Sequence, residues 1–595
     1  MAGRVSARAA AERWSPPCRA RSLLGFALAG VCLCMCSPGV AQDELSAQRA
    51  QYDADVPKTI LELQPFRTQV TVHLPDEPGV TASLTDLNPN IGAWYLLTLD
   101  SGGGWRRSYH LESPRHQGLR LAAAANAIRL SAGASSCLTW PGGTADPLEQ
   151  AERSGLPYAP LCGGALYLRN PVSGHRTSLE LITDFLRDHV WGGEQVITFV
   201  KREISHDAYL EHGGLVPVGP QRVTPVADAP RAATIAPGCD SRGVSPGSLA
   251  LDVSVPREGL PVGAWYPVGD PAGIFFSAFL PECAAAGMGG GPEPHVNPLD
   301  GVEAQALVYL VAFDLARVDL HFVLGTEHPR LDWSTRPPPS SQDARLPGPD
   351  GVDSPAPLIT NGMIPPADAP RTVATFIGGF KRVHGAFRYG VLAGRNHGSH
   401  YGFIEDGVIF SKLQPGLATV IVTADGSVDM RTWSQADDAG LAHIRYARQN
   451  GVPLIEYDAR RGVGVPGALV SLWGPGNWSG SADEVLRTLR AGLCLQEAAS
   501  RRFIIYGYFS SATPSAMARV FQAYGCRYAM LLDINALEHT YLAVYGHRGG
   551  QVLVEHLVEG MKELDRGVGG RLAPRFLGFP DDRDFFYLTQ HEAPP

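Results

Sequence analysis

Three side chains in the C-terminal half of the chain have types and positions that suit acid–base or anion-binding chemistry. Asp533 lies near the end of an almost wholly apolar run, and Asp458 directly follows another strand-like run. A carboxylate there can exchange protons with a ligand, because the rigid strand before it determines where it points. The planar guanidinium of Arg490 has several N–H donors that could bind an anionic group, and Arg487 is the alternative residue for the same role. A turn-capping role for Asp533 and a surface salt bridge for Arg490 stay open as the plainer interpretations.

A second group of residues could bind a polar ligand. Gly378 and Gly379 form a turn that allows the backbone to approach a ligand closely, and Lys381 and His384 follow it. Asn535, like the carboxylate at position 458, could hydrogen-bond hydroxyl groups or hold a cation. Two ordinary alternatives remain, namely that the glycines only form a turn and that the Lys and His side chains are solvated.

The elements that must position these residues are predicted from local patterns. In chain order they are a hairpin of 418–423 and 428–433, a helix over 438–449, a strand over 452–457, a strand over 503–509, a helix that begins at Thr513-Pro514, and a strand over 528–534. The strand–helix–strand order at the end of this series favours a β-α-β-type unit packed on a sheet. The C-terminal part is therefore expected to be an α+β domain.

The N-terminal part is expected to be β-rich, with one clear helix. Strand-like runs cover 69–74, 94–99 and 195–200. Thr177 and Glu180 form a capping box, and an apolar stripe follows them. Composition then divides the chain into a signal peptide (1–41), a β-rich N-terminal domain (42–215), a second β-rich region (216–327), a Pro-rich linker (328–370) and the C-terminal domain (371–595).

Residues 1–41 have the three parts of a secretory signal. A segment with five arginines and one acid precedes the apolar run 23–36, and small residues end at Ala41. The apolar run is shorter than the ~20 residues that a membrane span needs, so no stable span is expected. We predict a periplasmic or secreted protein.

Charge and cysteine content agree with export. The chain carries a net charge of −9 without a cluster of basic residues, which argues against nucleic-acid binding. Six cysteines follow the signal, and an even number in an oxidising compartment predicts disulfides. Fifteen pairings are possible for six cysteines. Sequential pairs stay within single domains, so we favour Cys137–Cys162, Cys239–Cys283 and Cys494–Cys526.

The order of several short motifs carries a resemblance to a known family. The segments are Phe376-Ile377-Gly378-Gly379-Phe380-Lys381 with His384-Gly385, then Thr423-Ala424-Asp425-Gly426, then 448–455, then Leu489-Arg490-Ala491-Gly492-Leu493, and finally 529–535. Together they resemble, in order, the phosphodiester glycosidase ("uncovering enzyme"-like) domain over about residues 371–590. Two departures touch the expected cleft: Ile377 stands where the family usually has Asn, and Leu532-Asp533-Ile534-Asn535 replaces a Leu-Asp-Gly-Gly form.

The resemblance implies release of a sugar from a sugar-1-phosphodiester of an envelope or extracellular glycan. Asp533, Arg490 and Asp458 would then be catalytic, and Lys381, His384, Asn535, Gly378 and Gly379 would bind substrate. No cofactor or metal is expected, although a divalent cation stays open, and the partner is a carbohydrate or glycosyl-phosphate ligand. Two other functions remain: a non-catalytic envelope protein that binds glycans or assembles with partners, and an ordinary glycosidase that uses Asp458 and Asp533 as a carboxylate pair roughly 5–10 Å apart.

Overall fold

The computed structural model describes residues 59–591, apart from several gaps. The longer gaps are 141–145, 186–207, 219–227, 254–258, 286–293, 328–354, 381–401 and 473–486, and some positions of one or two residues are also left out. The expected signal peptide, the expected strand 195–200, most of the expected linker, Lys381 and His384 therefore lie outside the described residues.

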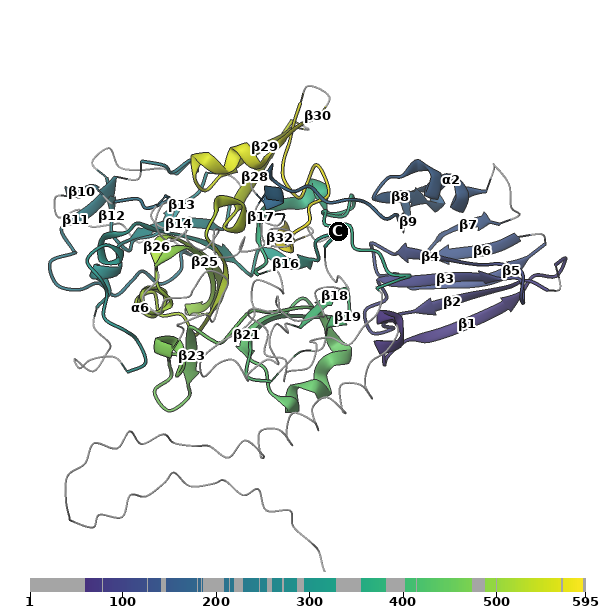
Figure 1. The fold of residues 1–595 in the computed structure, drawn as a ribbon, viewed down its shortest axis with the longest axis horizontal. Helices are drawn as coiled ribbons and strands as arrows, with labels where there is room; N and C mark the ends of the chain where they lie inside the picture. Colours follow the sequence, from purple (N-terminus) through teal and green to yellow (C-terminus); the bar gives the residue numbers. More distant parts are fainter. Residues whose placement is uncertain are drawn as a thin grey trace, which may run out of the picture.

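The protein is mostly β, so the expected α+β class is wrong. Strands make up 45% of the structure and helices 15%, and the paired strands form antiparallel ladders in several sheets (Figure 1). The clearest local error is the helix expected over 438–449, where a 3-10 helix η8 (Gln435–His443) leads into strand β22 (Ile444–Gln449). Strand β22 pairs with a strand on each side, so inter-strand hydrogen bonding outweighs the local helical pattern.

The N-terminal part contains two sheets, at the right of Figure 1. Their orders are β1-β2-β3-β4-β9-β8 and β5-β6-β7. The bounds are β1 (Thr68–His73), β2 (Thr81–Asp86), β3 (Trp94–Asp100), β4 (Arg106–Glu112), β5 (Leu119–Ala124), β6 (Ala127–Ala132), β7 (Ser135–Thr139), β8 (Tyr158–Leu161) and β9 (Leu166–Arg169), with helix α2 (Pro147–Ser154). The two sheets share one buried apolar cluster, which gives this part a core of its own.

An eight-stranded sheet forms the centre of the rest of the molecule, in the order β13-β14-β15-β26-β25-β27-β23-β24. The bounds are β13 (Tyr266–Pro267), β14 (Ile274–Phe279), β15 (Val308–Asp314), β23 (Ile455–Asp458), β24 (Val463–Pro466), β25 (Thr488–Ala498), β26 (Arg501–Ala512) and β27 (Tyr528–Ile534). Strand β15 pairs with β26 along its whole length. The sheet thus joins strands of the expected second region to strands of the expected C-terminal domain.

Two five-stranded sheets complete this part, in the orders β16-β32-β17-β28-β29 and β19-β18-β22-β20-β21. The bounds are β16 (Val318–Val323), β17 (Thr372–Ile377), β28 (Leu542–Arg548), β29 (Gln551–His556) and β32 (Phe585–Gln590) in the first, and β18 (Phe403–Glu405), β19 (Val408–Ser411), β20 (Ala418–Thr423) and β21 (Val428–Thr432) beside β22 in the second. The ladder of β20 and β21 confirms the expected hairpin.

Smaller elements connect these sheets. They are the strands β10 (Gly214–Pro217), β11 (Arg242–Ser245), β12 (Leu260–Pro261), β30 (Arg566–Val568) and β31 (Arg571–Ala573), and the 3-10 helices η1 (Ile60–Leu63), η2 (Cys162–Gly164), η4 (Pro281–Cys283), η5 (Glu303–Gln305), η6 (Ala369–Arg371), η9 (Val470–Leu472), η10 (Leu537–His539) and η11 (Glu559–Leu564).

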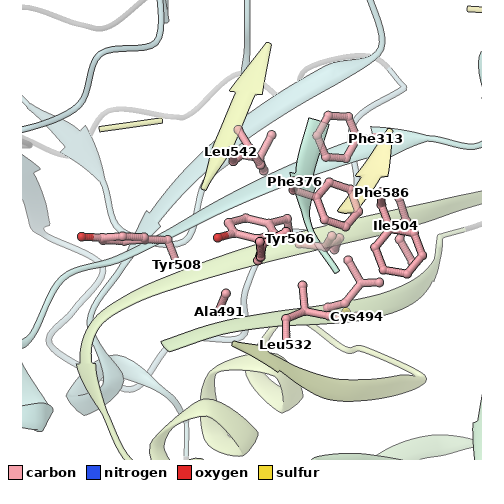
Figure 2. Close-up of a cluster of buried hydrophobic side chains, with 14 of the residues drawn as sticks. Phe313, Phe376, Ala491, Cys494, Ile504, Tyr506, Tyr508, Leu532, Leu542 and Phe586 are labelled. Carbon is pink, nitrogen blue, oxygen red and sulfur yellow. The ribbon is translucent and has the colours of Figure 1, made fainter. Parts of the chain in front are cut away.

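The eight-stranded sheet packs one face against the sheet that contains β17 and β32. Phe376 lies between the two layers, with its ring centroid 5.5 Å from that of Tyr506 and 5.3 Å from that of Phe586 (Figure 2). Phe313 stacks on the same ring at 6.2 Å. Aromatic side chains therefore fill the space between the two sheets.

Helix α6 (Pro514–Ala523) covers the opposite face. Thr513 caps it through Ala516 N–H with Pro514 in its first turn, as expected. Strands β26 and β27 both pair antiparallel with β25, so they run in the same direction on either side of it, and α6 connects them. Gly492 leaves room for the helix, since a Cβ there would lie 2.8 Å from Met517 and 2.9 Å from Phe521.

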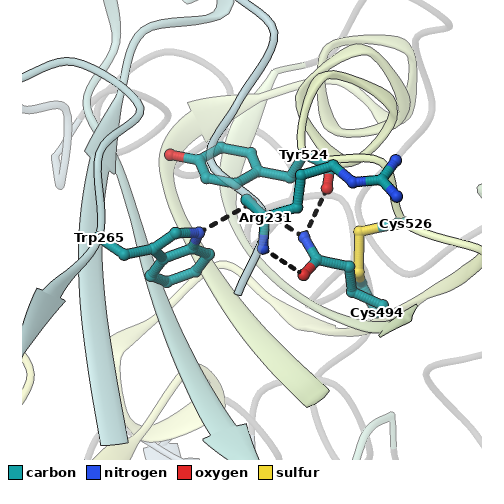
Figure 3. Close-up of a disulfide and its surroundings, with 6 residues drawn as sticks. Arg231, Trp265, Cys494, Tyr524 and Cys526 are labelled. Atoms are coloured by element: carbon teal, nitrogen blue, oxygen red, sulfur yellow. Dashed lines mark hydrogen bonds between the residues drawn. A yellow bond between two sulfur atoms is a disulfide. The ribbon is translucent and has the colours of Figure 1, made fainter. Parts of the chain in front are cut away.

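The structure contains three disulfides, Cys137–Cys162, Cys239–Cys283 and Cys494–Cys526, which are the pairs expected from the sequence. The third joins Cys494 in β25 to Cys526, three residues after the end of α6 (Figure 3). Gln496, two positions after Cys494, accepts from the backbone N–H of Arg231 and donates to the carbonyl oxygen of Tyr524. Three disulfides are consistent with an oxidising location outside the cytoplasm. Within the described residues, no helix has the length and apolar character that crossing a membrane requires.

Candidate active site

Asp533 lies near the C-terminal end of β27 and is only 3% exposed. The strand is buried along its whole length, so the backbone before this carboxylate is held firmly. One carboxylate oxygen accepts from the backbone N–H of Ile534 at 2.8 Å, and the other accepts from Nη1 of Arg583 at 2.8 Å. A buried carboxylate needs such donors, because it has lost its contact with water.

Arg583 is the centre of a cluster of four side chains. Its Nη1 donates to Asp533, its Nε donates to Oε1 of Glu180 at 2.5 Å, and its Nη2 lies 2.6 Å from Nε2 of His539. The other ring nitrogen of His539 is 2.8 Å from the carbonyl oxygen of Ile534, which can only accept. The histidine is therefore the Nδ1–H tautomer, and its Nε2 accepts from Arg583.

The charges of this cluster favour a permanently protonated arginine. Burial by itself lowers the pKa of the Arg583 guanidinium. The nearby carboxylates of Glu180 and Asp533 outweigh burial and raise that pKa above its ordinary value. One fixed positive charge thus faces two carboxylates that come from distant parts of the chain.

Arg583 belongs to a buried run of four charged residues, Asp581-Asp582-Arg583-Asp584, that precedes strand β32. Each member contacts a charged side chain from another segment. Asp581 pairs with Arg575 at 2.8 Å, Asp582 with Arg176 at 3.3 Å, and Asp584 with Arg448 at 3.2 Å. The run therefore acts as a hub where several segments meet.

Gly378 and Gly379 lie beside this hub, at the end of β17. The N–H of Gly378 donates to the carbonyl oxygen of Asp584 at 2.8 Å. Gly379 has a φ of 144°, and a Cβ there would come within 3.2 Å of the Asn450 side chain and 3.3 Å of Arg448. A side chain at position 379 would be strained and crowded, so glycine is required there for a close approach of the backbone.

Asn450 connects the glycine pair to the strand of Asp533. Its Nδ2 donates to the carbonyl oxygens of Leu531 at 2.6 Å and Leu532 at 2.5 Å. Three of the predicted site residues therefore lie near one another. Asp533 contacts Arg583, and Asn450 links its strand to Gly379. Gly378 bonds to Asp584, the residue after Arg583.

Arg490 does not join this group. It pairs with Phe509, whose ring packs on Phe521 of α6, so the Arg490 side chain lies on the α6 face of the sheet. Its Nε donates to the carbonyl oxygen of Ala512, which precedes α6, at 2.7 Å. Burial lowers the pKa of this guanidinium to about 10, while Glu303 acts against that shift. The arginine that contacts Asp533 is Arg583.

Asp458 and Asn535 are also held away from the cluster. Ile455 pairs with Ala529, so the antiparallel strand places Asp458 level with position 526, roughly 20 Å along β27 from Asp533. That spacing is too great for a carboxylate pair of a glycosidase. Asp458 instead accepts from the backbone N–H of Arg460 at 2.9 Å in a turn.

Asn535 has a φ of 82° and accepts from the hydroxyl of Thr488 at 3.0 Å, at the edge of β25. Its backbone N–H also bonds to β25, through the carbonyl oxygen of Leu489 at 2.9 Å. It therefore bonds to β25 and not to the residues around Arg583.

Sequence reasoning missed Glu180, Arg448, Asn450, Arg583 and Asp584. The first was recognised only as a helix cap. One signal was available for the hub, since four consecutive charged residues directly before the apolar run Phe585-Phe586-Tyr587 are unusual unless their charges are paired. Among the described residues, no group of three or more His, Cys, Asp or Glu side chains is placed to hold a metal ion.

No protein-family model and no curated protein matches the chain. Among solved structures, a hypothetical protein from Synechocystis is 11% identical with a TM-score of 0.24, covering 84% of this chain and 97% of that one. A putative exported protein from Burkholderia pseudomallei K96243 is 13% identical with a TM-score of 0.22, covering 64% of this chain and 99% of that one. At these TM-scores neither likeness supports an argument about fold or function.

Proposed function

We propose that this protein is an exported hydrolase that releases a sugar from a glycosyl phosphodiester, with its active site at the end of β27. The observation that carries the proposal is the grouping of Asp533, the Gly378–Gly379 turn and Arg583. A strand-end carboxylate, a turn that permits close backbone approach and a guanidinium are the groups that such a reaction uses. Asp533 and the glycine pair belong to the ordered motif segments, whereas Arg583 lies outside them.

In this proposal Asp533 exchanges the proton at the glycosidic oxygen or at the attacking water. Arg583 keeps the Asp533 carboxylate oriented through the Nη1 bond of 2.8 Å. The glycine pair lets the backbone pack closely against Asn450, Arg448 and Asp584, which supports Arg583 beside Asp533. Arg583 replaces Arg490 as the arginine of the site, because Arg490 contacts Ala512 before α6 whereas Arg583 contacts Asp533.

A non-catalytic role is the second candidate, and one observation favours it. The side chains of Asp533 and Glu180 are only 5% and 4% exposed, and both pair with Arg583. Buried and paired groups of this kind also hold protein segments together without any chemistry. In this second reading the protein binds envelope glycans or assembles with partners, and the cluster is structural.

Turnover distinguishes the two candidates. The purified protein is incubated with p-nitrophenyl and methyl diesters of hexose and N-acetylhexosamine 1-phosphates, and released reducing sugar is measured. We expect release with at least one diester and a loss of about 10²–10⁴-fold in Asp533→Asn, as for a removed acid–base group. Asp458→Asn is the matched control and should keep full activity. Equal rates in the wild type and Asp533→Asn would overturn the catalytic role.

Export is tested separately. We expect the mature protein to begin at Gln42 and to reach the periplasm or the medium. Mass spectrometry of the N-terminal peptide checks the cleavage site, and fractionation checks the location. An uncleaved chain in the cytoplasm would contradict this part of the proposal.

A further inference from the structure

Glu180 lies in the N-terminal part of the chain, 403 positions before the arginine that it contacts. It is 4% exposed. Its carboxylate lies on the same guanidinium that contacts Asp533, and its Oε1 is also 3.6 Å from Nε2 of His539. A residue outside the C-terminal motifs is therefore part of the first layer of contacts around Arg583.

The capping box determines where this carboxylate points. Oε2 of Glu180 accepts from the backbone N–H of Thr177 at 3.1 Å, and the Thr177 hydroxyl accepts from the N–H of Glu180 at 3.2 Å. One oxygen is thus used for the cap, and Oε1 remains for Arg583. A reciprocal pair of this kind restricts the side chain to few orientations.

The segment before the cap is bound tightly to the charged hub. The N–H of His175 donates to the carbonyl oxygen of Pro580 at 2.9 Å, and the N–H of Asp582 donates to the carbonyl oxygen of His175 at 3.3 Å. A Cβ at Gly174 would lie 2.5 Å from the backbone of Asp581, so glycine permits this contact. The position of Glu180 is therefore set by backbone bonds as well as by its own ion pair.

We propose that Glu180 is a positioning residue of the site, which shares the charge of Arg583 with Asp533 and thereby keeps Asp533 able to exchange a proton. This inference rests on the proposed function. A guanidinium paired with one carboxylate alone stabilises the ionised form strongly, whereas a second carboxylate nearby opposes ionisation of the first. Glu180, from the N-terminal part of the chain, thus affects proton exchange by Asp533 on strand β27.

Several other groups face the same cluster and must be held constant in any test. They are His539 beside Arg583, Tyr506 beside Asp533, and Asp582 and Arg575 beside the guanidinium and Glu180. The charge of Glu180 also acts on His175, Arg575 and Asp581, so the pH profile is interpreted together with the change in kcat.

The test compares pH–rate profiles of the wild type and Glu180→Gln on the diester that the wild type cleaves. Gln keeps the shape and the cap but removes the charge. We expect the pH–rate profile to change, with a fall in kcat of about tenfold and a smaller change in KM. Glu149→Gln, a glutamate of α2 paired with Arg107 and Arg153 on the surface, is the control and should leave the profile unchanged.

The outcomes separate this inference from the proposed function. An active wild type whose pH profile is unchanged in Glu180→Gln overturns the inference and leaves the function standing. A wild type that cleaves no diester overturns both. If Glu180→Gln does not fold, Glu180→Asp retains the charge on a shorter side chain, and we expect a lower kcat with the wild-type profile. An unchanged kcat in that variant would overturn the inference as well.

Discussion

Two buried arginines, Arg583 and Arg169, each lie between carboxylates from distant segments, yet their surroundings differ. Arg583 has an acceptor within 2.8 Å for each of its three nitrogen groups, and one of these acceptors is His539. Arg169 has one carboxylate oxygen of Glu112 at 2.5 Å and another of Glu405 at 3.7 Å. The first arrangement resembles a site with a defined geometry, and the second resembles a structural contact.

The cluster around Arg169 joins the N-terminal sheets to the rest of the molecule. Glu112 ends β4, and Glu405 ends β18. The guanidinium lies 4.2 Å from the centroid of the Trp94 ring and 5.2 Å from that of Tyr158. The Trp94 and Tyr158 rings therefore lie beside the guanidinium and exclude water from it. The carboxylates of Glu112 and Glu405 have lost their contact with water and have only this one arginine to balance their charge.

Burial disfavours the ionised form of the two carboxylates around Arg169. Burial raises the pKa of Glu112 to about 7 and that of Glu405 to about 8, although Arg169 acts against both shifts. The single positive charge of Arg169 does not fully compensate two desolvated carboxylates. A buried arginine therefore holds segments together in both clusters, and Arg583 differs in having an acceptor for each of its three nitrogen groups.

The largest expected effect comes from removing each arginine. Arg169→Met and Arg583→Met should each lower the free energy of unfolding by about 3–5 kcal/mol, since each leaves buried carboxylates without their partner. Urea unfolding measures this loss. Turnover per folded molecule should stay near the wild-type value in Arg169→Met and fall at least 100-fold in Arg583→Met. Equal activities in the two variants would remove the distinction between the clusters.

The pH dependence of stability should come from the Arg169 cluster. The folded-state pKa of Glu405, about 8, lies above its ordinary value of 4.5, so the folded state binds the proton more tightly. Stability is therefore highest below about pH 4.5 and is lost as pH rises from 4.5 to 8, by up to about 1.4 kcal/mol per pH unit for one proton. Glu112, whose folded-state pKa is about 7, adds to this loss between pH 4.5 and 7.

Glu405→Gln should flatten this decline between pH 4.5 and 8, because the amide does not titrate. Thermal unfolding of both proteins over this range measures the difference. Glu149→Gln, at an exposed pair, should follow the wild-type curve. Parallel curves for Glu405→Gln and the wild type would show that the carboxylate is compensated after all.

A smaller effect is expected at the cap that positions Glu180. Thr177→Ala removes the hydroxyl that accepts from the N–H of Glu180, at a cost of about 1 kcal/mol in unfolding free energy. Thr513→Ala at α6 removes an equivalent bond of 3.3 Å and should cost a similar amount. We expect Thr177→Ala to change turnover and Thr513→Ala to leave it unchanged, because only the Thr177 cap orients the Glu180 carboxylate. A loss of turnover in both would point to general instability.

The smallest effect is expected at Asp458. Its carboxylate is partly exposed and pairs with Arg461 at 3.6 Å. Asp458→Asn should change the unfolding free energy by less than about 0.5 kcal/mol and leave turnover intact. A strong loss of turnover would contradict the separation of Asp458 from Asp533 along β27.

Local patterns in the sequence determined the features that depend on neighbouring residues. The capping boxes and caps at Thr177 and Thr513, the hairpin of β20 and β21 and the buried strand β27 were all predictable, because each needs only hydrogen bonds or periodicity within a few positions. The three disulfides followed from the assumption that each pair stays within one domain.

Only the tertiary structure decided which charges meet and on which face of a sheet. Residues 444–449 form a strand because two neighbouring strands supply hydrogen-bond partners, and this kind of pairing made the protein mostly β. Arg490 pairs with Ile534, the neighbour of Asp533, at a register shift in the ladder, yet Arg490 contacts Ala512 before α6 whereas Asp533 contacts Arg583 before β32. Glu180 and Arg583 meet across 403 positions because burial requires each charge to find a partner, and no local pattern encodes such a contact.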